Sequence, residues 1–365
     1  MPVSSQSVAY GKRWTRVVAS TALAAGAALA AQGCSSALPG DNSAGGPAAP
    51  AVTLAEASHA WQSYRAWLPS SLTGTAKAPI TGVALVTRRL SAAPDNAVRY
   101  GTPAFYLPAA AGYPRWFVAD VNTTYAGPGR STQTPADGAL VPWMSPGNGP
   151  VLYLFEQASA AAPWLLASQS ALAPGTTVPA LAKDASGHVP TMRLSDSELL
   201  ARPDIAGPLQ ASVVDDGPAS AAAKVVGSGP LTTGLYSTMR GTLLGLSAPA
   251  GDVSQWELEG SNYRQFALRT ADGGALVFYA MYLNTTVEVL AALNKAEPVN
   301  PGPPITIPPY LAPLLQPGQS APRTSLEAQQ LLSFAAVDPA PGAGKIAVKI
   351  AVIGIGGGPS YASAS

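Results

Sequence analysis

Cysteine and histidine are scarce in this chain of 365 residues, which contains one of the former and two of the latter. A lone cysteine, Cys34, can form no disulfide within the chain, so the folded part must rest on its apolar core. His59 and His188 stand far apart, and His188 ends a turn-like run that starts at Asp184. This leaves little material for a zinc site or a Ser-His-Asp triad, so we predict no metal site and no catalytic residue.

Charged residues are also few, at 11% of the chain. Loss of the first 33 residues would remove three of the 21 basic residues and none of the 20 acidic ones, which leaves a net charge of −2. A protein that binds nucleic acid needs a basic face, so nucleic acid is not an expected partner. The chain lacks Gly-x-Ser-x-Gly, Ser-x-x-Lys, His-Glu-x-x-His and Walker lysine motifs, so we predict no cofactor.

A basic and then apolar segment opens the chain. Lys12, Arg13 and Arg16 precede Val17–Ala31, an uncharged run of small and apolar residues. A helix needs about 20 residues to cross the hydrocarbon core, so we interpret this shorter run as an export signal rather than a membrane span. The pair Lys12-Arg13 leaves a degenerate twin-arginine signal as an alternative.

The end of this segment, Leu29-Ala30-Ala31-Gln32-Gly33-Cys34, resembles the lipobox of bacterial lipoproteins. The resemblance implies that Cys34 is the lipidation site, carries a diacylglycerol and becomes the first mature residue. Ala31 and Gln32 depart from the commoner pattern, and ordinary cleavage at a nearby alanine is the alternative. We therefore expect a lipid-anchored protein at the extracytoplasmic face of the cell membrane, with the membrane as one partner.

Composition divides the chain into segments. We predict a signal peptide over residues 1–33, a disordered tether over 34–51, a first α+β unit over 52–188 and a second over 189–365, with a Pro-rich insert over 298–322. The tether combines Ser, Ala, Gly and Pro without periodicity, which favours a flexible chain. The insert cannot form a central strand, so we expect it to cover a sheet edge, with partner binding as the alternative.

The first unit begins with a helix. Thr53 and Glu56 form a capping box, and apolar residues recur at helical steps from Leu54 to Leu68, before Pro69. Short apolar runs separated by turn residues then predict strands at Gly82–Arg89, Ala104–Leu107, Arg115–Val118, Val151–Phe155 and Trp164–Ser168. Because the run from Val151 to Phe155 is uncharged, we expect it to be buried on both faces, against a helix on one side.

A long loop rich in Gly and Pro occupies residues 122–149. Long loops in compact domains are often functional, and Arg130 and Trp143 either pack a lid or contact a ligand. Asn122-Thr-Thr124 and Asn284-Thr-Thr286 fit a glycosylation sequon. Behind a bacterial export signal we interpret both as turns at strand ends.

The second unit repeats the order of elements. Ser195 and Glu198 have the spacing of a capping box, and a helical stretch interrupted by prolines leads to Tyr236–Arg240. The strand-like segments 263–268 and 275–279 echo 113–118 and 151–155. This order suggests two tandem units, each with a helix followed by a curved antiparallel sheet.

The carboxylates of this unit stand at expected turns and edges. Asp215-Asp216 precedes a glycine, and Glu257 and Glu259 flank a predicted strand, so solvated roles are favoured over a hydrolase pair. Residues 326–337 and 345–355 predict a closing hairpin. The glycine run from Gly354 to Gly358 is no phosphate loop, because no helix follows to supply the amides.

Several segments carry a resemblance to a known family. They are Tyr113-Pro-Arg-Trp-Phe-Val, Val151-Leu-Tyr-Leu-Phe-Glu, Pro163-Trp-Leu-Leu-Ala, Ala275-Leu-Val-Phe-Tyr-Ala and Val337-Asp-Pro-Ala-Pro-Gly. Together they look like a family of uncharacterised actinobacterial lipoproteins, over nearly all of the chain from about residue 52. The Pro-rich insert looks longer than that pattern. By analogy of fold alone, each unit resembles a cystatin-like or nuclear-transport-factor-like roll.

Two classes of function remain. The first is a non-catalytic surface lipoprotein that binds an envelope ligand, polymer or protein partner on its sheet scaffold. The alternative is an enzyme of the roll class that acts on a small apolar substrate in a sheet concavity. A pocket that holds a carboxylate with a raised pKa beside a tyrosine or an arginine would favour the enzyme.

Overall fold

The structure is a computed structural model. It describes residues 51–70, 79–88, 98–125, 148–246, 252–289, 311–320, 324–342 and 348–365, with the single residues 305, 307 and 322. Residues Pro47–Ser365 form one compact unit. The predicted signal peptide, the lipidation site Cys34 and all but the last residue of the predicted tether lie outside the described residues.

The described residues form four α-helices, which are α1 (Leu54–Ser70), α2 (Gly82–Arg88), α3 (Ala206–Asp216) and α4 (Thr233–Leu246). Short 3-10 helices cover Pro203–Ile205, Ala221–Lys224 and Ala312–Leu314. The strands are β1 (Val98–Tyr100), β2 (Ala104–Pro108), β3 (Arg115–Tyr125), β4 (Asn148–Gln157), β5 (Leu165–Leu172), β6 (His188–Val189), β7 (Asp252–Gly260), β8 (Phe266–Arg269), β9 (Ala275–Val289), β10 (Ser325–Asp338) and β11 (Ala351–Ala364). No helix among these has the length and apolar character needed to cross a membrane.

All these strands belong to one mixed sheet of 11 strands in the order β6-β2-β3-β4-β5-β11-β10-β9-β7, with β1 beside β3 and β8 beside β9. The predicted fold of two tandem helix-plus-sheet rolls is therefore wrong. The finding that overturns it is the antiparallel pairing of β5 with β11, in which Gly354 faces Leu172 and Ile355 faces Ala171. The predicted boundary between residues 188 and 189 falls inside β6, which pairs with β2.

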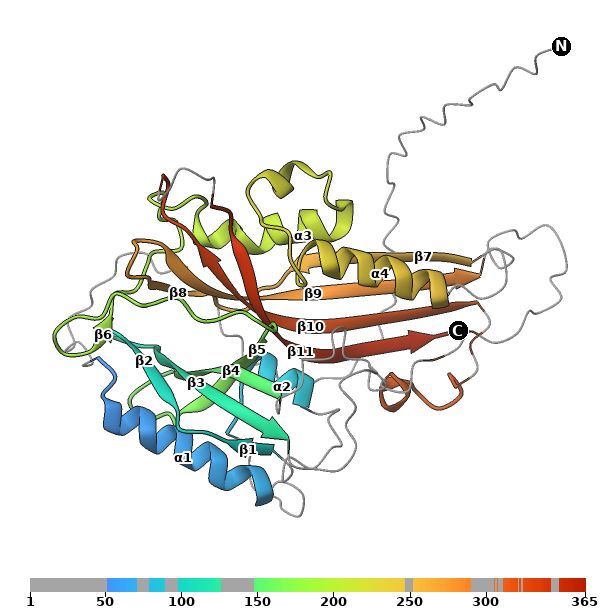
Figure 1. The fold of residues 1–365 in the computed structure, drawn as a ribbon. Coiled ribbons are helices and arrows are strands. Elements are labelled where there is room, and N and C mark those ends of the chain that lie inside the picture. The colour runs from blue at the N-terminus through green and yellow to red at the C-terminus, as the bar shows by residue number, and fades with distance from the viewer. Residues whose placement is uncertain are drawn as a thin grey trace, which may run out of the picture. The chain divides into compact units, whose positions relative to one another are not determined.

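The sheet folds back on itself at the β5–β11 junction. We call β1–β6 the first arm and β7–β11 the second arm. One face of each arm packs against the other arm through a single apolar cluster, which includes Val118, Leu154, Leu268 and Phe278. Helix α1 covers the outer face of the first arm, and α3 and α4 cover that of the second (Figure 1). The layers thus run helix, sheet, sheet, helix, and each arm has an inner and an outer face.

Strand β4 shows why the central strands are apolar throughout. Tyr153 and Phe155 pack under α1, whereas Leu152 and Leu154 pack against the second arm. All four side chains are at most 2% exposed. The prediction that Val151–Phe155 is buried on both faces is confirmed.

Helix α1 begins as the capping box predicts. The Glu56 amide donates to Thr53 Oγ1 at 3.2 Å, and the Thr53 amide donates to Glu56 Oε2 at 2.8 Å. The buried stripe runs from Ala57 to Leu68, but Leu54 is 60% exposed and does not belong to it. The capping box satisfies two of the free amide groups at the helix start.

Two other local predictions are wrong. Residues 82–88 form helix α2 rather than a strand, because packing on β5 and β11 outweighs the strand preference of Val83, Val86 and Thr87. Ser195 and Glu198 start no helix, since the Asp196 carboxylate accepts the Glu198 amide in a turn. The next helical residues begin at Pro203.

The glycine run in β11 allows the close crossing at the junction of the arms. A Cβ atom on Gly356 would lie 1.8 Å from Gln169 O, and one on Gly357 would lie 2.1 Å from Leu331 O. Gly357 also has a φ of 105°, which side chains rarely tolerate. The predicted hairpin is confirmed as the pairing of β10 with β11, but its second strand starts later and runs through the glycines.

Part of the Pro-rich insert packs on the second arm. Ile305 and Leu311 join Val287, Leu326 and Ala362 in a small buried cluster. These residues cover the outer face of β9, β10 and β11 beyond the helices. Most of the long loop, with Arg130 and Trp143, lies outside the described residues.

Candidate functional site

The inner face of the second arm has a part that neither the first arm nor α2 covers. Helix α2 packs on Ala280 and Leu331. Beyond those residues, side chains alternate along β7, β9, β10 and β11. The apolar ones lie on the outer face, and the polar ones lie on the inner face. We call this surface the open face, and define it as Gln255, Glu257, Glu259, Asn284, Thr286, Glu288, Glu327, Gln329, Tyr361 and Ser363.

The outward residues of the same strands explain why these polar side chains stay on one face. Leu258, Leu283 and Val287 are at most 3% exposed beneath the helices and the Pro-rich insert. A shift of one residue in register would bury the polar set and expose the apolar one. The core behind the open face therefore fixes the register of these strands.

A polar row crosses the open face. Glu257, Asn284, Gln329 and Tyr361 stand opposite one another on successive strands. Gln329 Nε2 donates to Asn284 Oδ1 at 2.9 Å, and Asn284 Nδ2 donates to Glu259 Oε2 at 3.2 Å. These hydrogen bonds fix the amide groups in one orientation before any partner arrives.

The open face carries four carboxylates, on Glu257, Glu259, Glu288 and Glu327. The ion pairs found among the described residues join other groups, namely Arg115–Glu56, Arg202–Asp204, Arg264–Glu156 and Arg269–Glu198. In that part of the chain no basic side chain balances the charge of the open face. Among the described residues, the open face therefore carries charge of one sign.

The free edge of β7 is closed by α3. Asp215 Oδ1 accepts the amide of Leu258 at 2.9 Å, and Trp256 Nε1 donates to Val214 O at 3.1 Å. Burial, together with the charges of Glu257 and Asp216, raises the pKa of Asp215 to about 6, against the opposing effect of the Leu258 amide. A strand partner cannot pair with this stretch of β7, so its accessible surface is the face and not the edge.

A small cavity adjoins the open face where α2 meets both arms. It has a volume of about 50 Å³, and its lining includes Glu156, Tyr263, Arg264 and Phe278. Arg264 pairs with Glu156 at 3.2 Å. Burial raises the pKa of Glu156, which the nearby Arg264 partly offsets, and burial beside Tyr282 raises the pKa of Tyr263. A space of this size holds only a few waters, whereas small-molecule sites have about 300–1,000 Å³.

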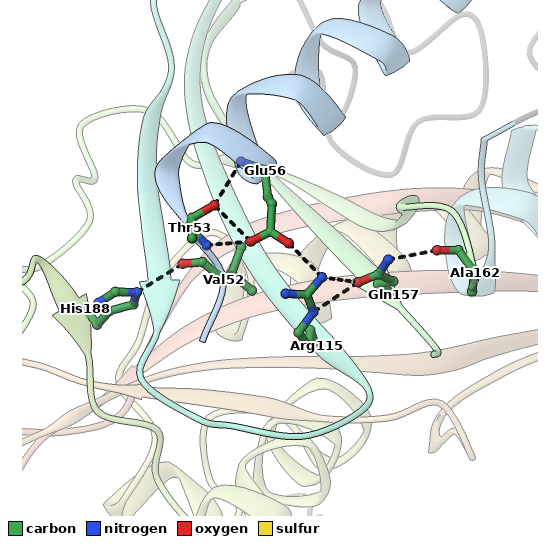
Figure 2. Close-up of polar contacts among 7 residues, drawn as sticks. All are labelled: Val52, Thr53, Glu56, Arg115, Gln157, Ala162 and His188. Carbon is green, nitrogen blue, oxygen red and sulfur yellow. Dashed lines mark hydrogen bonds and ion pairs between the residues drawn. The ribbon is translucent and has the colours of Figure 1, made fainter. Parts of the chain in front are cut away.

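A second polar cluster joins α1 to the first arm (Figure 2). Arg115 binds Glu56 Oε1 at 2.8 Å and donates through Nε to Gln157 Oε1 at 3.0 Å, and Gln157 Nε2 donates to Ala162 O at 2.8 Å. The guanidinium also lies over the rings of Tyr113 and Trp164. Burial would raise the pKa of Glu56, but bonds from Thr53 and Arg115 hold that pKa below its usual value. These contacts join α1 to β3 and β4, so the cluster fastens the helix to the first arm.

His188 follows the predicted turn directly and is the first residue of β6. Asp184 Oδ1 accepts the Ser186 hydroxyl at 2.7 Å and the His188 amide at 2.9 Å. The ring of His188 reaches Ser186 Oγ at 2.9 Å. Its other nitrogen lies 3.0 Å from Val52 O (Figure 2). The carboxylate therefore contacts the serine and not the imidazole, which is not the order of a catalytic triad. This group joins the turn to the start of the folded chain.

The other histidine, His59, is exposed on α1. No three His, Cys, Asp or Glu side chains in the described parts of the chain gather as a metal site. Glu257 and Glu259 lie inside β7, not beside a strand, and Asn284 lies in the middle of β9 rather than in a turn. These strands are longer than their sequence predicts, and for that reason Asn284, Gln329 and Tyr361 were not predicted as one row.

Comparison with known proteins adds a family but no activity. Residues 81–355 match the family described as a domain of unknown function (DUF8094). An uncharacterized lipoprotein of Streptomyces avermitilis is 29% identical over 180 residues, which make up 49% of this chain and 45% of that protein. The chain thus matches less than half the length of this curated relative. No solved structure matches it significantly.

Proposed function

The chain belongs to the family of the domain of unknown function DUF8094, and from that premise we propose that it is a membrane-anchored envelope lipoprotein that binds a partner through its open face without catalysis. The predicted resemblance to uncharacterised actinobacterial lipoproteins is confirmed by this match and by the Streptomyces avermitilis relative. The binding role, the absence of catalysis and the side of the membrane are parts of the proposal.

The lipid anchor is supported by two observations. The relative is described as a lipoprotein, and the run that ends in Ala31-Gln32-Gly33-Cys34 resembles a lipobox. In this proposal Cys34 carries the acyl chains and the folded part lies on the extracytoplasmic side. Mass spectrometry of membrane-extracted protein tests the anchor, because an unmodified Cys34 would contradict it.

The observation that carries the binding role is the pre-ordered polar row on a rigid sheet. Its side chains stand on strands whose other face is buried by helices, so their positions change little when a partner binds. The row is bordered by carboxylates that form no ion pair with the described residues, and by Tyr361, which is 52% exposed. A surface that is ordered and charged, and that the described helices and strands leave uncovered, is suited to recognition.

Carboxyl footprinting in cells tests this role. A water-soluble carbodiimide with a neutral amine would label Glu257, Glu259 and Glu327 on intact cells and on the purified full chain. We expect these sites to be protected on cells, whereas the exposed Glu198, which lies outside the open face, should be labelled equally in both. Equal labelling of the open face in the two samples would overturn the binding role.

The enzymatic alternative has one observation in its favour. The cavity beside α2 contains a carboxylate, Glu156, whose pKa is raised by burial, next to Tyr263 and Arg264. Its chemistry fits the criterion for a catalytic pocket, but its volume does not admit a substrate. A structure of the full chain with a small molecule seated against Glu156 would favour this alternative over binding alone.

A further inference from the structure

The open face also indicates the chemistry of its partner. Resting on the proposed binding role, we propose that the open face binds an extended, positively charged polypeptide segment with Lys or Arg at every second residue. Three features of the open face support this partner: its charge, the spacing of its carboxylates and its exposed tyrosine.

The charge of the face favours a cationic partner. Glu257, Glu259, Glu288 and Glu327 make no ion pair with the described residues. Like charges on one surface repel each other, and a partner of opposite charge relieves that repulsion and is steered toward the surface. Repulsion disfavours an anionic polymer for the same reason.

The spacing of the carboxylates matches an extended chain. Glu257 and Glu259 lie two residues apart on β7, so about 6.6–6.8 Å of strand separates them. Glu288 and Glu327 stand on β9 and β10 as diagonal neighbours, because Glu327 faces Thr286, and such neighbours are about 7–8 Å apart. Side chains on one face of an extended peptide repeat at nearly the same interval. Basic residues at alternate positions can therefore reach successive carboxylates.

The remaining groups suit the rest of such a peptide. The ring of Tyr361 is 52% exposed and stands opposite Gln329, where it can hold a cationic head or the methylene stem of a lysine. Asn284 and Gln329 each keep one amide hydrogen beyond the bonds of the polar row. These hydrogens can donate to the carbonyl groups of a peptide that lies across the face.

The neighbouring surfaces do not offer an equal alternative. The centre of the β7 edge is occupied by Asp215 and α3, so strand addition is blocked there. The cavity at Glu156 is too small for a side chain of the partner to enter fully. A neutral polysaccharide could use the amides and Tyr361, but it would leave the four carboxylates without counter-charges.

Peptide binding to the purified full chain in neutral detergent tests the proposal. The probe is a labelled nonapeptide in which Lys alternates with Ser, and its isomer with all lysines contiguous has the same charge. We expect the alternating peptide to bind about tenfold more tightly than its isomer, and both to weaken as salt is added. Equal affinities would overturn the extended arrangement.

Matched variants locate the site. The variant E257Q/E259Q/E288Q/E327Q removes the carboxylates of the open face, and D196N/E198Q/D204N/D216N removes four elsewhere. We expect the first to weaken binding at least about tenfold and the second by less than about twofold. Urea unfolding of each variant shows whether it is folded. If the quadruple variant of the open face does not fold, the single variant E257Q replaces it in the binding measurement.

Two outcomes separate this inference from the proposed function. Protection of the open face on cells without binding of the alternating peptide would overturn the cationic partner and leave the binding role in place. Binding of a neutral dextran that depends on Tyr361 and not on the carboxylates would also overturn it. An equal loss of peptide binding in both charge variants would show that the peptide senses only the net charge.

Discussion

The two arms of the sheet differ in how they fill the space under their helices. The first arm packs α1 through large rings, among them Phe117 and Phe155, whose centroids are 4.9 Å apart in a stacked pair. The second arm has one stacked pair, Tyr279 and Phe334, but most of its core under α3 and α4 is small or aliphatic, and a Cβ atom on Gly207 would lie 3.2 Å from the Tyr279 ring. Small residues such as Gly207 let α3 lie close to the sheet.

The arms also differ in the length of their strands. Strands β3, β4 and β5 have 11, 10 and 8 residues, whereas β9 has 15 and β10 and β11 have 14 each. The inner face of the second arm therefore extends beyond its contact with the first. The open face occupies this extra length, so the difference between the arms creates the candidate site.

The junction of the arms offers the largest expected effect. In Gly356→Ala the new Cβ would overlap Gln169 O, a backbone atom that cannot move without breaking the β5–β11 pairing. We expect a loss of at least about 5 kcal/mol or no folded protein. Gly260→Ala is the control, because its Cβ would meet nothing within 4 Å. Urea unfolding measures both, and a stable Gly356→Ala would contradict the crossing geometry.

A pair of core substitutions tests whether the arms are one cooperative unit. Phe155→Ala removes a ring under α1, and Phe334→Ala removes one from the core of the second arm; both rings are 1% exposed. Each should cost about 3–5 kcal/mol. Since the arms share an apolar cluster between their inner faces, each change should shift the same single unfolding transition. A change that moves only one of two transitions would show that the arms unfold independently.

The sequence predicted local elements better than their assembly. Four of the strand predictions in the first arm and the capping box of α1 are confirmed, because these depend on neighbouring residues. The β5–β11 pairing joins residues about 180 positions apart in sequence, and no local pattern encodes such a contact. Gly356 and Gly357 are the local sequence feature that indicates this pairing, because glycines inside a strand often mark a close approach of another backbone.

The candidate site was harder to predict than the fold. Glu257 and Glu259 were noted as carboxylates but placed at a strand edge, and Asn284 was placed in a turn. Their common face depends on the registers of β7, β9, β10 and β11, which long-range packing sets. Alternation of Leu283 and Val287 with polar residues was the local signal, and the sequon-like Asn284-Thr-Thr286 obscured it.

A buried carboxylate in the second arm predicts an unusual dependence of stability on pH. Asp338 is 0% exposed at the end of β10, and burial raises its pKa to about 7. The nearby amides of Ala201 and Leu200 offset this only in part. Neither completes a hydrogen bond to the carboxylate, and the Leu200 amide donates to Pro339 O at 3.0 Å.

The carboxyl group of Asp338 therefore keeps its proton up to about pH 7 in the folded state. In the unfolded chain the same group loses its proton above its ordinary pKa of 3.8. The contribution of Asp338 to the free energy of unfolding should fall as the pH rises from about 4 to about 7, and stay level above that. Asp338→Asn should remove this slope and stabilise the protein by roughly 1–3 kcal/mol at pH 8. Urea unfolding across this range measures it, with Asp204→Asn as a surface control. An unchanged slope in Asp338→Asn would contradict the prediction.

The smallest expected effect compares one ion pair from each arm. Arg115–Glu56 in the first arm has side chains 7% and 35% exposed, whereas Arg269–Glu198 in the second has side chains 35% and 73% exposed. Water and salt screen the second pair almost fully, so Glu198→Gln should change stability by less than about 0.5 kcal/mol.

Glu56→Gln leaves the buried guanidinium without its carboxylate, and the half-exposed position of Glu56 limits the loss to about 1 kcal/mol. Because the pKa of Glu56 is lowered in the folded state, its contribution should be present above about pH 4.5 and disappear as the pH falls further. Urea unfolding of both variants at neutral and acidic pH measures the difference. Equal losses in the two variants would show that burial of Arg115 does not distinguish the arms.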